Sequence, residues 1–108
     1  MRDTIHTQEW RRVVAAIPSG SVATPNARSL LFYSNLQGIR HYTVEQFNED
    51  EKEFAALVAR ATTEWIVLPK YSLYSALVHV VDASSTYQRF AEFEHTLIYR
   101  SVNAGVFK

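Results

Sequence analysis

Three helix-like segments, each followed by a short apolar segment, alternate along residues 7–71 of this 108-residue sequence. The pairs are 10–17 with 21–24, 27–35 with 39–44, and 51–61 with 65–68. The first and third helix-like segments space their apolar residues three or four apart, and the second carries Leu30, Leu31 and Phe32 beside Tyr33. Each apolar segment ends near a turn residue. Because parallel neighbours in a sheet need a long crossover connection, this alternation predicts a parallel sheet covered by helices.

The first two helices have recognisable ends. The apolar stripe of the first consists of Trp10, Val13, Val14 and Ile17. Thr7 is expected as the N-cap of this helix, and Pro18 with Gly20 is expected to end it. Asn26 is expected to cap the second helix, and Gly38 suits the left-handed position after its last turn.

The third helix and the third strand are marked most clearly. Residues 48–51 read Asn-Glu-Asp-Glu, a capping signature whose acids suit the positive end of the helix dipole. Residues 65–68 read Trp-Ile-Val-Leu without a polar interruption, which is typical of a central parallel strand buried on both faces. Pro69 is expected to end this strand.

The remaining sequence favours one helix and a hairpin. Residues 72–81 show helical spacing, although they include several β-branched residues, and we favour a helix there. Residues 87–94 and 97–102 predict two strands around a turn at 94–96. The predicted fold is one α/β domain over residues 1–108. It is a small three-layer domain with a mainly parallel sheet, helices on both faces and a C-terminal antiparallel hairpin.

Composition excludes several classes of function. Eleven basic and eleven acidic side chains cancel, so no global field attracts nucleic acid or anionic lipid. The absence of cysteine excludes disulfides and thiolate chemistry. The apolar runs are far shorter than the roughly 20 residues that cross a bilayer, and the first residues lack the apolar core of a signal peptide. We therefore expect a soluble protein or a soluble fragment.

No motif for catalysis or metal binding is present. The four histidines, which lack the spacing of a helical metal pair, are His6, His41, His79 and His95. There is no G-x-S-x-G elbow, and the three glycines cannot form a dinucleotide fingerprint. The acids at 49–51 are explained by the start of a helix. We expect no catalytic residue, cofactor or metal site.

Six tyrosines offer another kind of surface. Their flat rings and hydroxyl groups could line a carbohydrate or lipid groove, or they could simply lie at the edge of the core.

Seven side chains lie in or just after the three strands expected to be parallel. They are Thr24, Asn26 and Arg28 for the first strand, Thr43 and Glu45 for the second, and Lys70 and Tyr71 for the third. Ligands of open α/β sheets bind outside the carboxyl ends of the strands, so this set is the candidate ligand site. Arg28 beside a helix N-terminus is able to hold an anion such as phosphate. Alternatively, Asn26 is only a cap, and Arg28 and Lys70 are solvated.

The order of these segments resembles a known family. The stretches "EWRRVVAAIPSGSVATPNARSLLFYSNLQGIRHYTV", "TEWIVLPK" and "FAEFEHTLIYRSV" look like the C-terminal domain of membrane glycosyltransferases that use polyprenyl-phosphate sugars, similar to dolichyl-phosphate-mannose-protein mannosyltransferases. The resemblance rests on Ile17, Pro18, Gly20, Val22, Tyr33, Arg40, residues 65–68, Ile98, Tyr99 and Arg100. Trp65 stands where the family usually has tyrosine.

The resemblance implies an extracytoplasmic or periplasmic domain that follows the last membrane span. The catalytic acids of the family lie in membrane-proximal loops with no counterpart here, so no catalytic residue is carried over. The expected function is a non-catalytic accessory domain that binds or orients a glycan, a polyprenyl-phosphate sugar or the membrane-embedded parent enzyme.

Two other hypotheses stay open. The first is that the chain is a free-standing interaction module that dimerises through an exposed hairpin edge at 97–102. The second is that the chain is a small-molecule enzyme with its active site near Asn26, Arg28 and Lys70.

Overall fold

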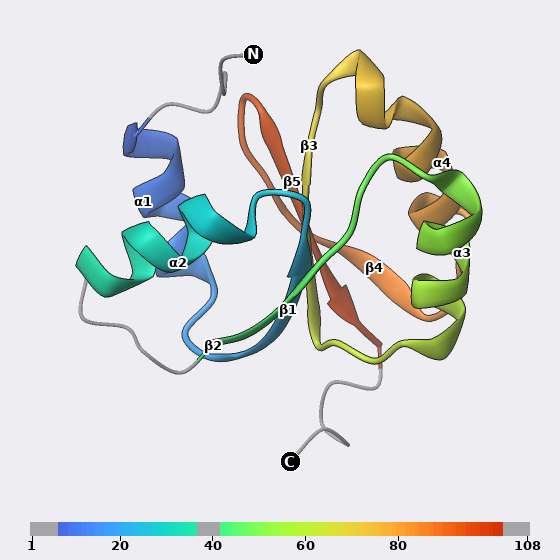
Figure 1. Ribbon diagram of the computed structural model, residues 1–108, viewed down its shortest axis with the longest axis horizontal. Helices are drawn as coiled ribbons and strands as arrows, with labels where there is room; N and C mark the ends of the chain where they lie inside the picture. The colour runs from blue at the N-terminus through green and yellow to red at the C-terminus, as the bar shows by residue number, and fades with distance from the viewer. Residues whose placement is uncertain (1–6, 37–41, 103–108) are drawn as a thin grey trace.

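The computed structural model describes residues 7–36 and 42–102, and within them the chain forms helices around one sheet (Figure 1). The elements are α1 (Thr7–Ala16), β1 (Gly20–Thr24), α2 (Ala27–Leu36), β2 (Tyr42–Gln46), α3 (Glu51–Arg60), β3 (Trp65–Pro69), the 3-10 turn η1 (Ser72–Tyr74), α4 (Ser75–Asp82), β4 (Tyr87–Glu92) and β5 (Thr96–Ser101). Every predicted helix and strand has a counterpart here. The predictions for Gly38, for the strand start at 39–41, and for His6 and His41 lie outside the described residues.

The five-stranded sheet is mixed. Its strand order is β2-β1-β3-β5-β4. β1 pairs in parallel with β2 and with β3, whereas β5 pairs antiparallel with β3 and with β4. The prediction of a mainly parallel sheet was therefore wrong, because half of the strand pairings are antiparallel. β3 is buried along its whole length, as expected, but only one of its two neighbours is parallel to it.

β5 lies inside the sheet rather than at its edge. α4 carries the chain from β3 to β4, which runs in the same direction, and the following turn sends β5 back into the gap between them. Five of the six residues of β5 are buried, whereas four of the six in β4 are exposed. The expectation that 97–102 forms the exposed edge was wrong. β4 is the outer strand of the hairpin.

Two clusters of buried side chains pack on opposite faces of the sheet. Ile66 and Leu68 of β3 join the cluster built with α3 and α4, while Trp65 and Val67 join the one built with α1 and α2. This alternation is the period of two that a strand imposes. Figure 1 shows the same division, with α1 and α2 on one side of the sheet and α3 and α4 on the other.

Two helix and strand ends show the local chemistry that fixes them. Asp50 is the N-cap of α3, in the predicted segment, and its Oδ1 accepts a hydrogen bond from the Glu53 N–H at 3.1 Å. Gly20 begins β1 with φ of 118°, a backbone conformation that a residue with a side chain rarely adopts. α1 already includes Thr7, which was expected to precede it as the cap.

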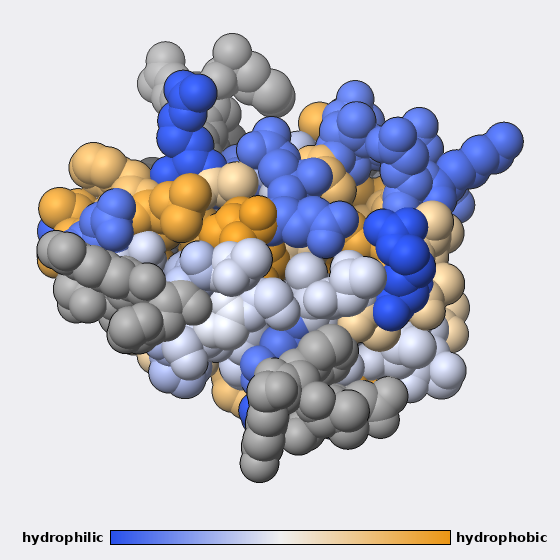
Figure 2. Space-filling view, turned by 60° about the horizontal axis from the view of Figure 1, so that its bottom comes forward, coloured by the Kyte–Doolittle hydropathy of each residue, from blue (hydrophilic) through white to orange (hydrophobic). Residues whose placement is uncertain are grey.

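The surface carries apolar side chains on α2. Leu31, Phe32 and Leu36 are exposed. Figure 2 shows hydrophobic surface gathered on the left of the molecule, the side on which Figure 1 draws α1 and α2. In the described part of the chain, no helix has the length and apolar character needed to cross a membrane.

Candidate functional site

Six of the seven predicted ligand residues lie at or near one edge of the sheet, whereas Thr43, the second residue of β2, lies near the opposite end of its strand. The carboxyl ends of β1, β2 and β3 meet at the first of these edges because these strands run in the same direction. The end of β4 and the start of β5 reach the same edge, since β5 is antiparallel to both β3 and β4. Ligands of α/β sheets bind at such an edge.

Lys70 and Tyr71 line a pocket of about 300 Å³ at this edge. We call it the β3 pocket, because it opens where β3 ends. Its other lining residues come from η1 and α4, from β4 and from β5, and are Ser72, Ser75, Val78, His79, Arg89, Glu92 and Leu97. The volume is at the small end of the range for ligand sites. None of the other five predicted residues lines this pocket.

A continuous chain of charged contacts runs through three lining residues of the β3 pocket, Lys70, Glu92 and Arg89, to Asp82 outside the lining. The ammonium of Lys70 donates to Glu92 Oε2 at 2.6 Å. The other oxygen of Glu92 lies 3.5 Å from the guanidinium of Arg89. Arg89 in turn binds Asp82 through two parallel hydrogen bonds, from Nε to Oδ1 at 3.1 Å and from NH2 to Oδ2 at 2.8 Å. Each cation therefore has a carboxylate partner.

These contacts change the acidity of both carboxyl groups. Hydrogen bonding by Arg89 lowers the pKa of Asp82, and the Tyr99 hydroxyl, which donates to Asp82 Oδ1 at 2.8 Å, adds to this effect. Hydrogen bonding by Lys70 lowers the pKa of Glu92. Burial raises the pKa of the Tyr99 hydroxyl, and the neighbouring Asp82 raises it further. The carboxyl groups of Asp82 and Glu92 therefore stay charged near neutral pH.

The second group of predicted residues belongs to β2. Glu45 lines a separate pocket of about 310 Å³ between β2 and α3. Its carboxylate accepts a hydrogen bond from Thr62 at 3.3 Å and lies 3.9 Å from the guanidinium of Arg60. Thr43 is exposed on the same strand and does not line this pocket.

The third group surrounds the turn from β1 to α2. Thr24 is fully buried, and its hydroxyl accepts a hydrogen bond from the Asn26 N–H at 3.2 Å. This contact fixes the turn, which is a structural role. Asn26 Oδ1 is buried without a hydrogen-bond partner among the described residues. Arg28 is exposed in the first turn of α2.

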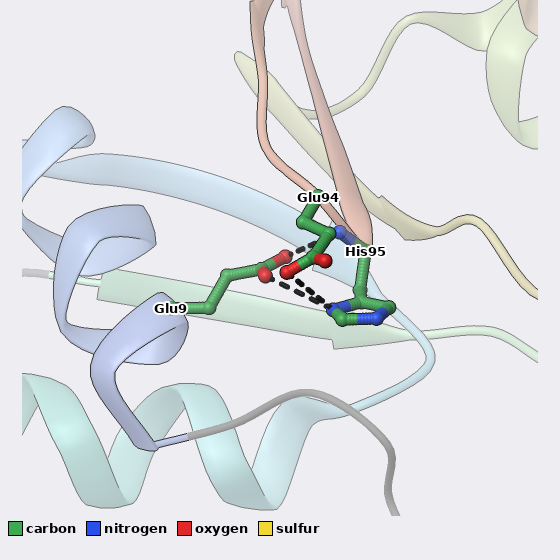
Figure 3. A group of neighbouring side chains, drawn as sticks. All are labelled: Glu9, Glu94 and His95. Atoms are coloured by element: carbon green, nitrogen blue, oxygen red, sulfur yellow. Dashed lines mark hydrogen bonds and ion pairs between the residues drawn. The ribbon is translucent and has the colours of Figure 1, made fainter.

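A buried carboxylate, which the sequence did not single out, lies at the same edge. Glu9 of α1 is 7 % exposed, and its Oε2 accepts hydrogen bonds from the His95 N–H at 2.9 Å and from the Thr96 hydroxyl at 2.6 Å. Its Oε1 lies 3.2 Å from His95 Nδ1. Figure 3 shows Glu9 pointing from the helix toward Glu94 and His95 in the turn between β4 and β5. Glu9 therefore joins α1 to this turn.

The sequence alone did not identify the charged residues around Lys70 in the β3 pocket, or the contact between Glu9 and the turn before β5. Arg89, Glu92 and Asp82 belong to α4 and β4, and only the strand order brings them beside Lys70. The sequence of β4 did hold a signal for the charged residues. Arg89 and Glu92 are charged, whereas the paired strand β5 has an apolar run, and this contrast marks β4 as the strand with side chains on the surface. For Glu9 no signal was available, since His95 is 86 residues away.

No family model matches this sequence, and comparison with curated proteins and with solved structures found no similar protein. The kinship with membrane glycosyltransferases that the sequence suggested therefore stays a prediction.

Proposed function

We propose that this chain is a non-catalytic binding domain that holds a small, neutral, polyhydroxylated ligand, such as a sugar, in the β3 pocket. The observation that carries the proposal is the balance of charge in the pocket wall. Lys70 and Arg89 in the lining supply two positive charges. Glu92 in the lining and Asp82, which binds Arg89 from outside the lining, supply two negative charges.

This balance favours a neutral ligand over an anion. A phosphate entering the pocket would compete with Glu92 and Asp82 for cations that these carboxylates already bind. A sugar hydroxyl does not have this problem, because it both donates and accepts hydrogen bonds. It is able to donate to Glu92 and to accept from the remaining N–H groups of Lys70 or Arg89.

The rest of the wall suits a sugar ring. Val78 and Leu97 supply apolar surface to the pocket. The ring of Tyr71, just before η1, has its centroid 6.2 Å from that of Tyr74, the last residue of η1. Aromatic and apolar side chains cover the C–H faces of a sugar, while the charged side chains bind its hydroxyl groups. Ser72 and Ser75 add hydroxyl groups on the helical side.

The sequence resemblance supplies a biological context for such a domain. We propose that it serves as the accessory domain of a membrane glycosyltransferase outside the cytoplasm, where it binds the glycan part of acceptor or carrier. The charge balance of the β3 pocket supports the sugar as the recognised group rather than the phosphate of the carrier.

Ligand titration followed by NMR tests this proposal. We expect millimolar monosaccharides to shift the amide signals of Lys70, Tyr71 and Ser72, while inorganic phosphate leaves them unchanged. Glu92→Gln removes the charge of one acceptor and keeps its shape, so we expect sugar affinity to fall by about tenfold, as for a lost hydrogen bond to a charged group. The matched control is Glu45→Gln in the neighbouring pocket, which should leave affinity unchanged. Binding of phosphate but not sugars would contradict the ligand class, and no binding at all would contradict the function.

A further inference from the structure

We propose that Glu9, Glu94 and His95 form a binding site for a divalent transition metal, with Zn²⁺ as the best fit. One carboxylate oxygen from each glutamate and the Nδ1 of His95 lie within 4.8 Å of one another. The residues come from α1 and from the turn between β4 and β5, and their side chains converge (Figure 3). This site is separate from the β3 pocket and does not depend on the function proposed for it.

The spacing of the donor atoms fits a tetrahedral ion. Two ligands at the usual zinc distances of about 2.0–2.1 Å, in tetrahedral geometry, are about 3.3–3.4 Å apart. Glu9 Oε1 and His95 Nδ1 are 3.2 Å apart. Glu94 Oε1 and His95 Nδ1 are 3.9 Å apart. The Glu94 side chain is 80 % exposed, so a small rotation of a flexible chain closes the remaining gap.

The charge at this place also favours a cation. The Glu9 side chain is only 8 % exposed, and within residues 7–36 and 42–102 no lysine or arginine forms an ion pair with it. Two carboxylates therefore share one imidazole, which supplies at most one positive charge. Buried charges in proteins are paired or coordinate metals, and a divalent ion balances both glutamates at once.

The surrounding contacts hold two of the three donors, Glu9 and His95, in place before any ion binds. The second oxygen of Glu9 is fixed by the His95 N–H and by the buried hydroxyl of Thr96. The turn itself is closed by the hydrogen bond from the Phe93 N–H to the Thr96 carbonyl at 2.8 Å, and the Lys70 N–H donates to the His95 carbonyl at 3.0 Å. Such outer contacts orient ligands in metal sites and strengthen binding.

The donor set selects the class of metal. Imidazole nitrogen suits zinc, copper, iron and nickel, whereas magnesium and calcium prefer oxygen alone. Exposure of Glu94 leaves the outer side open, so water is able to complete the four ligands.

Calorimetric titration of the chelator-treated chain with Zn²⁺ alone tests the proposal. We expect one ion per chain, and Co²⁺ in its place should give the visible absorption of a tetrahedral site. His95→Ala should lower the affinity by tenfold or more, on the scale known for lost metal-site contacts. Mg²⁺ should bind weakly, and His95→Ala should not change its affinity.

Two further variants keep the test decisive. Glu94→Gln changes an exposed side chain, so it should fold normally and still weaken Zn²⁺ binding several-fold. His79→Ala, at an exposed histidine outside the site, is the matched control and should bind Zn²⁺ as the unchanged chain does. Absence of Zn²⁺ binding, or binding that neither His95→Ala nor Glu94→Gln weakens, would overturn the proposal.

Discussion

Asp82 is the residue that connects the charged wall of the β3 pocket to the core. It accepts hydrogen bonds from the exposed Arg89 and from the hydroxyl of Tyr99, whose side chain is buried under α4. Both donors favour the charged carboxylate, which is why the pKa of Asp82 is lowered from its ordinary 3.8. The position of Arg89 in the pocket therefore depends on the ionisation of Asp82 together with its contact with Glu92.

This coupling predicts how stability changes with pH. A carboxyl group whose pKa is lower in the folded state adds stability above its unfolded value and loses it as the pH falls. Asp82→Asn should be less stable than the unchanged chain at neutral pH, and the difference should shrink as the pH falls through about 3.8 toward the lowered value. Urea unfolding at a series of pH values measures this difference. Glu49→Gln, at an exposed acid, is the control, and a difference that stays constant with pH would contradict the prediction.

Among the helices and strands, α3 shows how far local sequence signals reach. The segment 48–51 marked its start, and Asp50 caps it there, with Asn48 Oδ1 also accepting from the Asp50 N–H at 2.8 Å. At the other end, Ala61 has a positive φ of 50° and its N–H binds the carbonyls of Leu57 and Val58. The acidic run therefore belongs to the helix start.

Removing the cap should weaken the domain by a known amount. Asp50→Ala deletes the acceptor for the Glu53 N–H, so we expect a loss of about 1 kcal/mol in the free energy of unfolding. Thermal or urea unfolding followed by circular dichroism measures this loss. Glu49→Ala removes the neighbouring acid, which is not the cap, and should cost much less. Equal losses for the two variants would mean that charge, not the hydrogen bond, acts at this end.

The strand order shows where local reasoning ends. Periodicity identified the strands because burial on one or both faces is recorded in adjacent residues. It did not identify neighbours, because pairing joins segments far apart, such as β3 with β5. One signal was there: residues 97–99 read Leu-Ile-Tyr, an apolar run that resembles the run in β3 and marks an interior strand. β4 instead exposes Arg89, Phe90 and Glu92.

The edge formed by β4 is poorly suited to pairing with a second copy of the chain. The register shifts between Arg89 and Ala91, so Phe90 is an extra residue that interrupts the ladder. Bulges and charged side chains are the usual means by which proteins protect a sheet edge. The candidate ligand residues were predicted from the rule that ligands of α/β sheets bind at the carboxyl ends of the strands. This rule identifies the edge of the sheet but does not specify which side chains share a pocket. The predicted residues therefore fell into three groups.

For the molecule as a whole, β3 is the structural link between the two buried clusters. Its side chains alternate between them, and β5 alternates in the same way, with Leu97 and Tyr99 in one cluster and Ile98 in the other. A substitution in either cluster therefore affects β3 or β5, which contribute side chains to both clusters. This arrangement predicts a single cooperative unit rather than two halves that open separately.

Matched substitutions on the two faces test this unity. Ile66→Ala lies in the cluster with α3 and α4, and Ile98→Ala lies in the cluster with α1 and α2; both side chains are fully buried. Each should cost about 2–5 kcal/mol, the usual range for truncating a buried isoleucine. In native-state hydrogen exchange, either substitution should lower the protection of the slowest amides of α1 and of α3 by the same free energy. If Ile66→Ala lowered protection in α3 while leaving α1 unchanged, the two faces would open independently and the sheet would not couple them.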